Sequence, residues 1–224
     1  MNNKGLEYLI RSSMYDEYHL KELLRENNFN VPNRILLEQD IKTKPKNLVY
    51  PAALKVVDIN ILHKSEKGGV KLWIQNWDEA ASEIKKMKNR FPNKSLMLEE
   101  MSLKGVETIV GVVEDSQFGH FLMFGTGGIY AELFGDVSFR SIPLDKNDAE
   151  EMIEETALSK LIESGFRDIK VDHDCVVNFL LNVSRFVDQN KELISQLDLN
   201  PVMFDGSTSI ILDAKLIPRQ TGSK

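Results

Sequence analysis

Residues 54–72 read LKVVDINILHKSEKGGVKL, and this stretch carries more information about the fold than any other in the chain. An apolar run that contains Lys55 leads into a polar segment with His63 and the adjacent glycines Gly68 and Gly69. A strand-like pattern then returns at residues 70–74. Branched and aromatic residues on both sides of a glycine turn predict two neighbouring strands. The first strand would carry a lysine, and the connecting loop a histidine.

The glycine pair has two interpretations. Adjacent glycines let backbone N–H groups approach an anion closely, and Lys55 on the preceding strand would then meet the same phosphates. The alternative is a plain hairpin turn. The stretch matches neither of the two common phosphate-loop patterns, GxxxxGK[ST] and GxGxxG, so the residues alone leave both interpretations open.

The bulk composition excludes several classes of protein. The 224 residues are 42% hydrophobic and 28% charged, which is ordinary for a globular protein with a real core. A net charge of -6 argues against a non-specific nucleic-acid partner. No apolar run is long enough to span a membrane, and the single cysteine, Cys175, cannot form an internal disulfide. We therefore expect a cytoplasmic protein without nucleic-acid or membrane partners.

The remaining patterns mix helices with pairs of strands. Helical spacing begins at residue 16, recurs over residues 76–90 and 172–190, and predicts one long helix over residues 144–166 that stops at Gly165. Short apolar runs between residues 95 and 139 predict a strand-rich middle, and residues 197–204 and 209–217 predict two closing strands. This order favours an α+β fold over one doubly wound sheet.

Two further segments carry candidate ligand-binding residues. In EEMSLKGVE, residues 99–107, the acidic turn would suit a flat heterocycle, and Glu107 would accept hydrogen bonds from ribose hydroxyls. A charged surface turn is the alternative. On a strand, Asp198 and Asn200 share one face, and with Asp213 they form an all-oxygen set of the kind Mg²⁺ prefers. Acids that simply face water are the alternative. The sequence DHD at residues 172–174 favours a helix cap over a metal site.

The order of these motifs resembles the ATP-grasp fold, in which two α+β lobes hold a nucleotide between them. ALKVVDINILHKSEKGGVKL, GVETIVGVVEDSQFG, FGTGGIYAELFGDVSFRSIPL and LDLNP are most similar to the ATP-grasp (beta) subunit of ADP-forming acyl-CoA synthetases, the acetate–CoA ligase (ADP-forming) type. Succinyl-CoA synthetase beta chains are more distant relatives. The resemblance implies a single ATP-grasp domain over residues 1–224. Its smaller nucleotide lobe would span residues 20–99, and residues 1–19 plus 100–224 would form the larger lobe with the magnesium site.

The resemblance also implies roles for individual residues. Lys55 would hold nucleotide phosphates beneath the loop of Gly68 and Gly69, and His63 would carry phosphate transiently. The remaining assignments are the adenine hinge at Glu99, Glu100 and Met101, the ribose contact at Glu107, and the Mg²⁺ ligands Asn200 and Asp213 with help from Asp198.

The family reaction is acyl-CoA + ADP + phosphate ⇌ acid + ATP + CoA. The resemblance therefore implies ATP or ADP and Mg²⁺ as bound groups, and a separate CoA-binding alpha subunit in an α₂β₂ assembly. Two alternatives stay open. One is another ATP-grasp ligase that joins a carboxylate to an amine or thiol and needs no histidine at position 63. The other is a non-catalytic regulatory subunit that only binds nucleotide.

Overall fold

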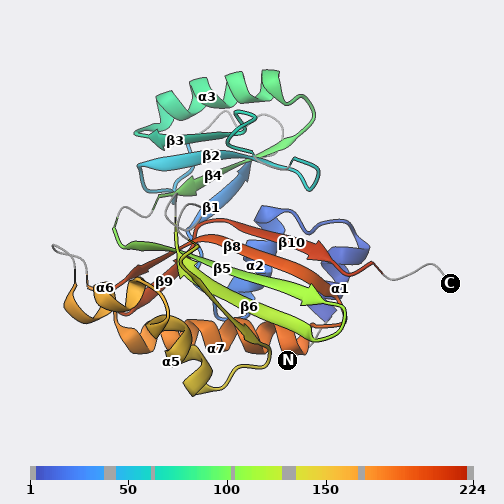
Figure 1. Ribbon diagram of the computed structural model, residues 1–224. Coiled ribbons are helices and arrows are strands. Elements are labelled where there is room, and N and C mark those ends of the chain that lie inside the picture. The colour runs from blue at the N-terminus through green and yellow to red at the C-terminus, as the bar shows by residue number, and fades with distance from the viewer. Residues whose placement is uncertain are drawn as a thin grey trace.

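The computed structural model describes residues 4–37, 44–61, 64–101, 104–127, 135–165 and 170–220. These residues form two antiparallel sheets with helices packed against them, so the predicted α+β fold is confirmed. Figure 1 shows the smaller sheet above the larger one.

The smaller sheet has the strand order β1-β4-β2-β3. Its strands are β1 (Arg34–Leu37), β4 (Ser95–Glu100), β2 (Ala52–Val57) and β3 (Val70–Ile74). All six residues of β2 are buried, because this strand lies inside the sheet and α3 (Trp77–Arg90) packs against it. The predicted pair of strands around the glycine turn is confirmed, since β2 and β3 pair in antiparallel register.

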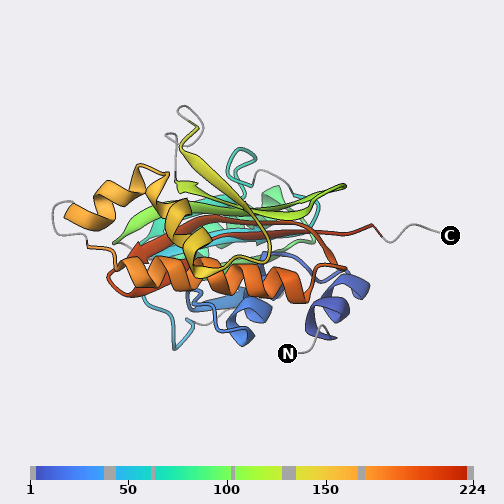
Figure 2. The same cartoon turned by 60° about the horizontal axis from the view of Figure 1, so that its bottom comes forward.

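The larger sheet has the order β10-β8-β5-β6-β7, with β9 paired to β8. Its strands are β5 (Val106–Asp115), β6 (Gly119–Thr126), β7 (Val137–Ser141), β8 (Ile194–Asp205), β9 (Thr208–Ile211) and β10 (Ala214–Pro218). Its helices are α1 (Lys4–Arg11), α2 (Glu17–Glu26), α5 (Lys146–Glu154), α6 (Leu158–Ser164) and α7 (His173–Gln189). Figure 2 shows α1, α2 and α7 on the same side of this sheet. The opposite face carries no described helix.

Local side chains explain where the helices begin. Asp16 caps α2 by accepting a hydrogen bond from the backbone N–H of His19, and Asn76 caps α3 in the same way. Asp172 accepts from the N–H of Asp174 at the start of α7, so the predicted helix cap there is confirmed.

Two predicted elements were wrong in extent. The single long helix over residues 144–166 is two helices, α5 and α6. The hydroxyl of Thr156 bonds back to the carbonyl of Ile153, and Asp136 accepts from the N–H of Ala157. These contacts satisfy the backbone at the break. The predicted strand over residues 209–217 is also divided into β9 and β10, which both pair with β8, because Leu212 and Asp213 between them leave the regular ladder.

The two lobes have separate cores. One core fills the smaller sheet and α3, and the other fills the space between the larger sheet and its helices. Leu20, Leu23 and Leu24 of α2 belong to the larger core, although they lie inside the expected smaller lobe of residues 20–99. We therefore propose that the smaller lobe begins after α2. Over the described ranges, no helix is long and apolar enough to cross a membrane.

Candidate functional site

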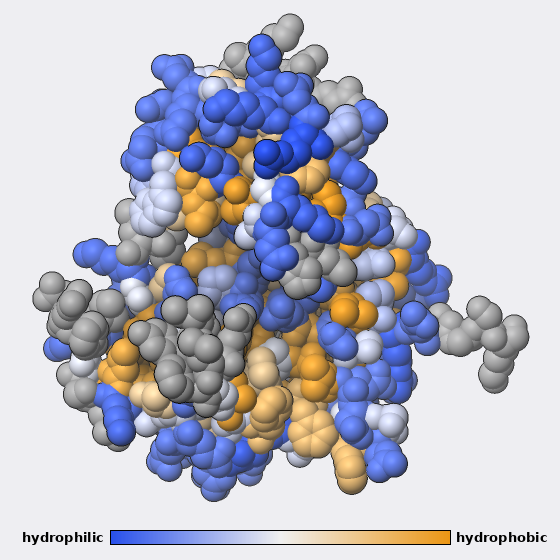
Figure 3. Space-filling view, turned by 45° about the horizontal axis from the view of Figure 1, so that its top comes forward, coloured by the Kyte–Doolittle hydropathy of each residue, from blue (hydrophilic) through white to orange (hydrophobic). Residues whose placement is uncertain are grey.

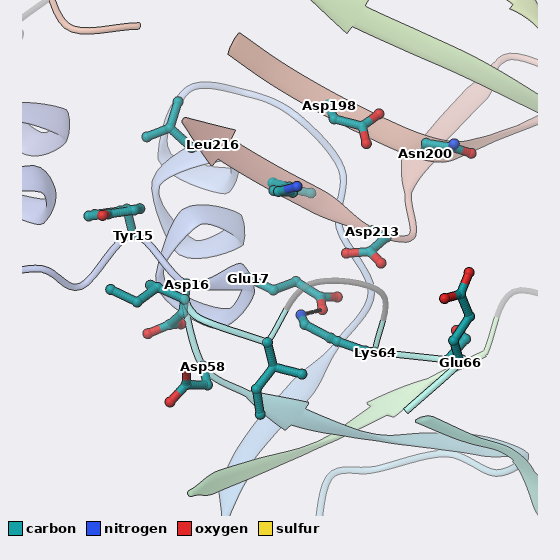
Figure 4. A pocket seen from close by; sticks show the side chains of 15 residues that line it. Tyr15, Asp16, Glu17, Asp58, Lys64, Glu66, Asp198, Asn200, Asp213 and Leu216 are labelled. Atoms are coloured by element: carbon teal, nitrogen blue, oxygen red, sulfur yellow. Dashed lines mark hydrogen bonds and ion pairs between the residues drawn. The ribbon is translucent and has the colours of Figure 1, made fainter. Parts of the chain in front are cut away.

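Two cavities lie side by side where the lobes meet. The first has a volume of about 370 Å³ and the second about 530 Å³, and both are lined by Ser65 and Asp213. Figure 3 shows the hollow between the lobes, with apolar side chains at its upper edge. Figure 4 shows the first cavity from close by.

The second cavity collects most of the residues that the sequence assigned to a nucleotide. Those residues are Lys55, Glu99, Glu100, Met101 and Glu107, and the candidate metal ligand Asp213 also lines this cavity. Its other walls are largely apolar and include Leu72, Trp73 and Met203. A cavity with a lysine and carboxylates at one side and apolar side chains at another suits a ligand with a flat base and a charged tail.

Lys55 projects from β2 into a ring of oxygen atoms. Its Nζ lies 2.8 Å from Oε1 of Glu17, 2.9 Å from Oε1 of Glu99 and 2.7 Å from the carbonyl oxygen of Leu212. Burial opposes the charged form, but Glu17, Glu99 and Asp213 together raise the pKa of Lys55 well above its ordinary value. Lys55 is therefore a fixed cation at the boundary of the two cavities.

Sequence reasoning missed two charged residues of this cluster, Glu17 and Lys21. Lys21 is fully buried and donates to Glu17, Glu99 and the carbonyl of Leu212 at 2.7–2.8 Å. Burial alone would raise the pKa of Glu17. The positive charges of Lys21, Lys55 and Lys64 instead hold the pKa of Glu17 well below its ordinary value. In the sequence these two residues look like an ordinary i,i+4 pair on a helix, and nothing there shows that the pair is buried.

In the acidic hinge at residues 99–101, the side chains of Glu99 and Glu100 point in opposite directions. Glu99 points at Lys21 and Lys55, whereas the carboxylate of Glu100 accepts from the side-chain amide of Asn33 and the N–H of Val49. This division follows from the alternation of side chains along β4. The N–H of Met101 donates to the carbonyl of Pro51, so the hinge backbone is already partly satisfied.

The rim of the second cavity holds Glu107 and an aromatic residue that the sequence did not single out. Glu107 is the second residue of β5 and is exposed. Trp73 lies on β3, is 56% exposed and has φ +64°, a conformation that is uncommon for a non-glycine residue. Strained backbone of this kind clusters at ligand sites. The expected nucleotide roles of Glu99, Glu100, Met101 and Glu107 stay predictions.

The glycine pair has a structural reason of its own. Gly68 has φ +69°, and a Cβ on Gly69 would lie 2.6 Å from Val56. Their N–H groups donate to the carbonyls of Ser65 and Lys64, at 3.0 and 2.6 Å, so the turn uses these donors itself. Neither glycine lines either cavity. These contacts favour the turn interpretation, and a phosphate role for the pair stays a prediction.

The expected phosphate carrier, His63, lies outside the described residues. The neighbour that follows it, Lys64, is described and lines the first cavity. Lys64 donates to Oε2 of Glu17 at 2.6 Å, a contact marked in Figure 4.

The three candidate magnesium ligands also line the first cavity. Asp198 and Asn200 lie on the same face of β8, as predicted, and the N–H of Asn200 donates to the backbone carbonyl of Asp213 at 3.2 Å. In Figure 4 all three side chains border the same space, across from the contact between Glu17 and Lys64. The structure therefore brings the set together, although its function as a metal site stays a prediction.

The donor chemistry of this set fits Mg²⁺. Burial, followed by the charge of Glu17, raises the pKa of Asp213 to about 6, although Lys55, Lys64 and Lys21 oppose this shift. Burial also raises the pKa of Asp198. Among the described residues no three His, Cys, Asp or Glu side chains converge as a metal cage. Mg²⁺ typically takes one or two carboxylates and completes its shell with water and substrate phosphates.

Comparison with known proteins identifies the class. Residues 10–217 match the ATP-grasp domain family. The beta subunit of acetate–CoA ligase (ADP-forming) II from Pyrococcus furiosus is 34% identical over 213 residues, which cover 90% of each chain. Acetate–CoA ligase (ADP-forming) II from Archaeoglobus fulgidus is 36% identical over 204 residues, and these cover 90% of this chain but 30% of that longer one. The chain thus belongs to the family of ATP-grasp beta subunits of ADP-forming acyl-CoA synthetases.

Solved structures agree with this assignment. The acetyl-coenzyme A synthetase 1 of Ca. Korarchaeum cryptofilum, in complex with coenzyme A and Ca-AMPCP, superposes with a TM-score of 0.86 at 32% identity. The match covers 98% of this chain and 100% of that one. A second structure of the same protein holds Mg-AMPPCP and has its phosphohistidine segment pointing towards the nucleotide binding site, with a TM-score of 0.81 over 97% of this chain and 99% of that one. The predicted ATP-grasp fold is confirmed.

Proposed function

We propose that this chain is the nucleotide-binding beta subunit of an ADP-forming acyl-CoA synthetase. It transfers phosphate between a phosphohistidine and ADP, within the overall reaction acyl-CoA + ADP + phosphate ⇌ acid + ATP + CoA. The observation that carries the proposal is the second cavity, which gathers Lys55, the hinge at residues 99–101 and Glu107 from separate strands. The nucleotide analogues held by the Korarchaeum relative support the same ligand class.

The two cavities suit the two ends of the transfer. The apolar wall with Trp73 and Met203 would take the base, Glu107 the ribose, and Lys55 the phosphates. The bond from phosphorus to a histidine nitrogen breaks, and a new bond forms to a β-phosphate oxygen of ADP, which leaves neutral imidazole and ATP. Such transfers depend mainly on positioning and on neutralising phosphate charge.

Asn200, Asp213 and Asp198 would hold Mg²⁺ at the phosphates. When bound, the ion supplies positive charge to the phosphate oxygens during transfer. The other acidic side chains that line the first cavity add negative charge around these three residues, and this charge attracts a cation even before nucleotide binds.

A CoA-binding alpha subunit is the partner that this function requires. The P. furiosus relative is itself a beta subunit, and the A. fulgidus relative is a single longer chain of which this chain spans about 30%. We propose an α₂β₂ assembly, which sedimentation of the purified complex would test. The single cysteine, Cys175, fits the cytoplasm as the proposed location.

The open face of the larger sheet offers a surface for that partner. Strand pairing aligns Ile217, Gln196 and Val113 in one cross-strand row. The next row on the same face contains Asp198 and Phe139. Ile217, Val113 and Phe139 are exposed apolar side chains, and Figure 3 shows apolar side chains on the lower lobe. The surface is continuous with the candidate metal ligands through Asp198, so a partner seated there would reach the site.

Calorimetric titration of the purified chain with ADP, with and without Mg²⁺, tests the nucleotide site. We expect binding that Mg²⁺ strengthens and that Lys55→Met weakens. Lys71→Met is the matched control, because Lys71 is an exposed lysine on β3 that lines neither cavity. Titration of the complex with its co-purified partner repeats the measurement in the assembled protein. Absence of ADP binding in both forms would refute the proposal.

Turnover with the partner tests the histidine step. We expect His63→Gln to abolish ATP formation from acyl-CoA, ADP and phosphate while ADP binding persists. Full turnover in this variant would instead favour a ligase that works without a histidine carrier. Turnover that does not respond to Asp213→Asn would favour a regulatory nucleotide-binding subunit.

A further inference from the structure

We propose that Glu17 is a positioning residue that joins Lys55, at the nucleotide side of the site, to Lys64, the residue that follows His63 in the chain. Its role in turnover rests on the function proposed above. The contacts themselves concern only described residues and hold whatever the reaction is.

The two oxygen atoms of Glu17 serve different partners. Oε1 accepts from Lys21 and from Lys55, each at 2.8 Å. Oε2 accepts from Lys64 at 2.6 Å. One carboxylate therefore connects α2, the sheet lysine of β2 and the segment after His63, which are far apart in the sequence.

Burial and contacts within α2 fix the position of Glu17. Its side chain is 1% exposed, and Lys21 on the next turn of α2 is held by Glu17, Glu99 and the carbonyl of Leu212. Asp16 caps the helix directly before Glu17. A carboxylate in the first turn of a helix is also stabilised by the helix dipole. Glu17 thus offers a rigid acceptor to whatever approaches from the cavity.

The two cavity lysines depend on Glu17 to different degrees. Lys55 has two other oxygen partners, in Glu99 and Leu212, and keeps them if the charge of Glu17 is removed. For Lys64 the ion pair with Glu17 is the contact that joins it to the cluster. Loss of the Glu17 charge should therefore displace Lys64 more than Lys55.

This difference predicts a split between binding and turnover. In the assembled enzyme, Glu17→Gln should lower kcat about tenfold or more while the KM for ADP changes less than about threefold. Lys64→Met should reproduce the loss of kcat, and because Lys64 lies in a loop segment, this variant tests the proposal even if Glu17→Gln folds poorly. Glu22→Gln is the control on the same helix, since Glu22 pairs with Arg25 and Arg34 and with no cavity lysine.

A double-mutant cycle separates positioning from general damage. If Glu17 acts through Lys64, the Glu17→Gln/Lys64→Met double variant should lose no more kcat than the worse single variant. Losses that multiply would mean that the two residues act independently, which would overturn the proposal.

Limited trypsin digestion of the isolated chain tests the ion pair between Glu17 and Lys64 without an enzyme assay. Trypsin must engage the Lys64 side chain to cut the bond between Lys64 and Ser65, so the ion pair should protect that bond. We expect Glu17→Gln to accelerate this cut severalfold relative to cuts after Lys88, whereas Glu22→Gln should leave the ratio unchanged. If every cut is accelerated and the ratio of the cut after Lys64 to the cut after Lys88 is unchanged, Glu17→Gln destabilises the whole chain. That result would refute the positioning role. Because ADP is absent, this result is independent of the nucleotide-binding test above.

Discussion

The two cavities share Ser65 and Asp213 but differ in what lines them. The second combines a lysine with apolar walls, and the first is dominated by carboxylates from several elements. Between them lies a buried cluster of lysines and glutamates centred on Glu17. Under the proposed function, the base and the ADP phosphates would bind in the second cavity, and Mg²⁺ and the phosphoryl donor would lie in the first. Within this cluster, Glu17 pairs with Lys55, which lines the second cavity, and with Lys64, which lines the first.

The largest expected effect comes from breaking the cluster between the cavities. Glu17→Gln leaves three lysines with too little negative charge, and breaking a buried ion pair costs about 3–5 kcal/mol of unfolding free energy. The pKa of Glu17 is lowered in the folded state, so its stabilisation is full above the unfolded-state value and is lost as pH falls through the folded-state value. Urea unfolding at pH 7 and at lower pH should show the gap between wild type and variant closing in acid.

A constant gap across that pH range would contradict the ionised state of Glu17 in the fold. Glu22→Gln serves as the control here too, because Glu22 is about a third exposed and its loss should cost much less.

The next largest effect sharpens the assignment of the second cavity. Removal of the Lys55 charge should weaken ADP binding about 10- to 100-fold, because a hydrogen bond to a charged group is worth about 1.5–3 kcal/mol. Calorimetry on Lys55→Met and Lys71→Met measures the difference. Equal affinities in the two variants would place the phosphates elsewhere.

The first cavity should respond to metal rather than to ADP alone. Asp213→Asn removes one of the two candidate carboxylate ligands, so we expect the gain in ADP affinity on adding Mg²⁺ to shrink about tenfold, or about 1.4 kcal/mol. ADP binding without Mg²⁺ should change little. If Mg²⁺ strengthens binding equally in wild type and variant, the two-sided division of the site fails.

The smallest effect concerns the base. Trp73→Leu should weaken ADP binding by about 1 kcal/mol, at the lower end of measured base stacking on aromatic side chains. Inorganic pyrophosphate, which has no base, should bind wild type and variant equally. Quenching of tryptophan fluorescence by ADP should fall in the variant, since the chain has two tryptophans and the other, Trp77, packs against the small core. A variant that also loses pyrophosphate binding would show that Trp73 supports the lobe rather than the base.

Local features of the fold were predictable because they depend on neighbours in the sequence. The cap at Asp172 and the helix stop at Gly165 involve residues within a few positions of one another. The strands β2 and β3 follow one another directly in the chain and pair across the segment that holds Gly68 and Gly69. The long helix over residues 144–166 was not predictable in the same way. Its break depends on Asp136, which lies outside the helical pattern and accepts from Ala157.

The sequence by itself determined the α+β class, the family and the set of candidate residues, because strand patterns and quoted motifs survive in the linear order. Only the tertiary structure decided which charges meet. Glu17 reaches Lys55 and Lys64 across 38 and 47 positions of chain, and Lys21 reaches Glu99 across 78. Such pairs form only when α2, packed in the larger lobe, brings Glu17 and Lys21 against β2 and β4 of the smaller sheet and the charged groups are buried there. Periodicity and spacing carry no record of that packing, so the buried carboxylate at the centre of the site looked like an ordinary helix residue.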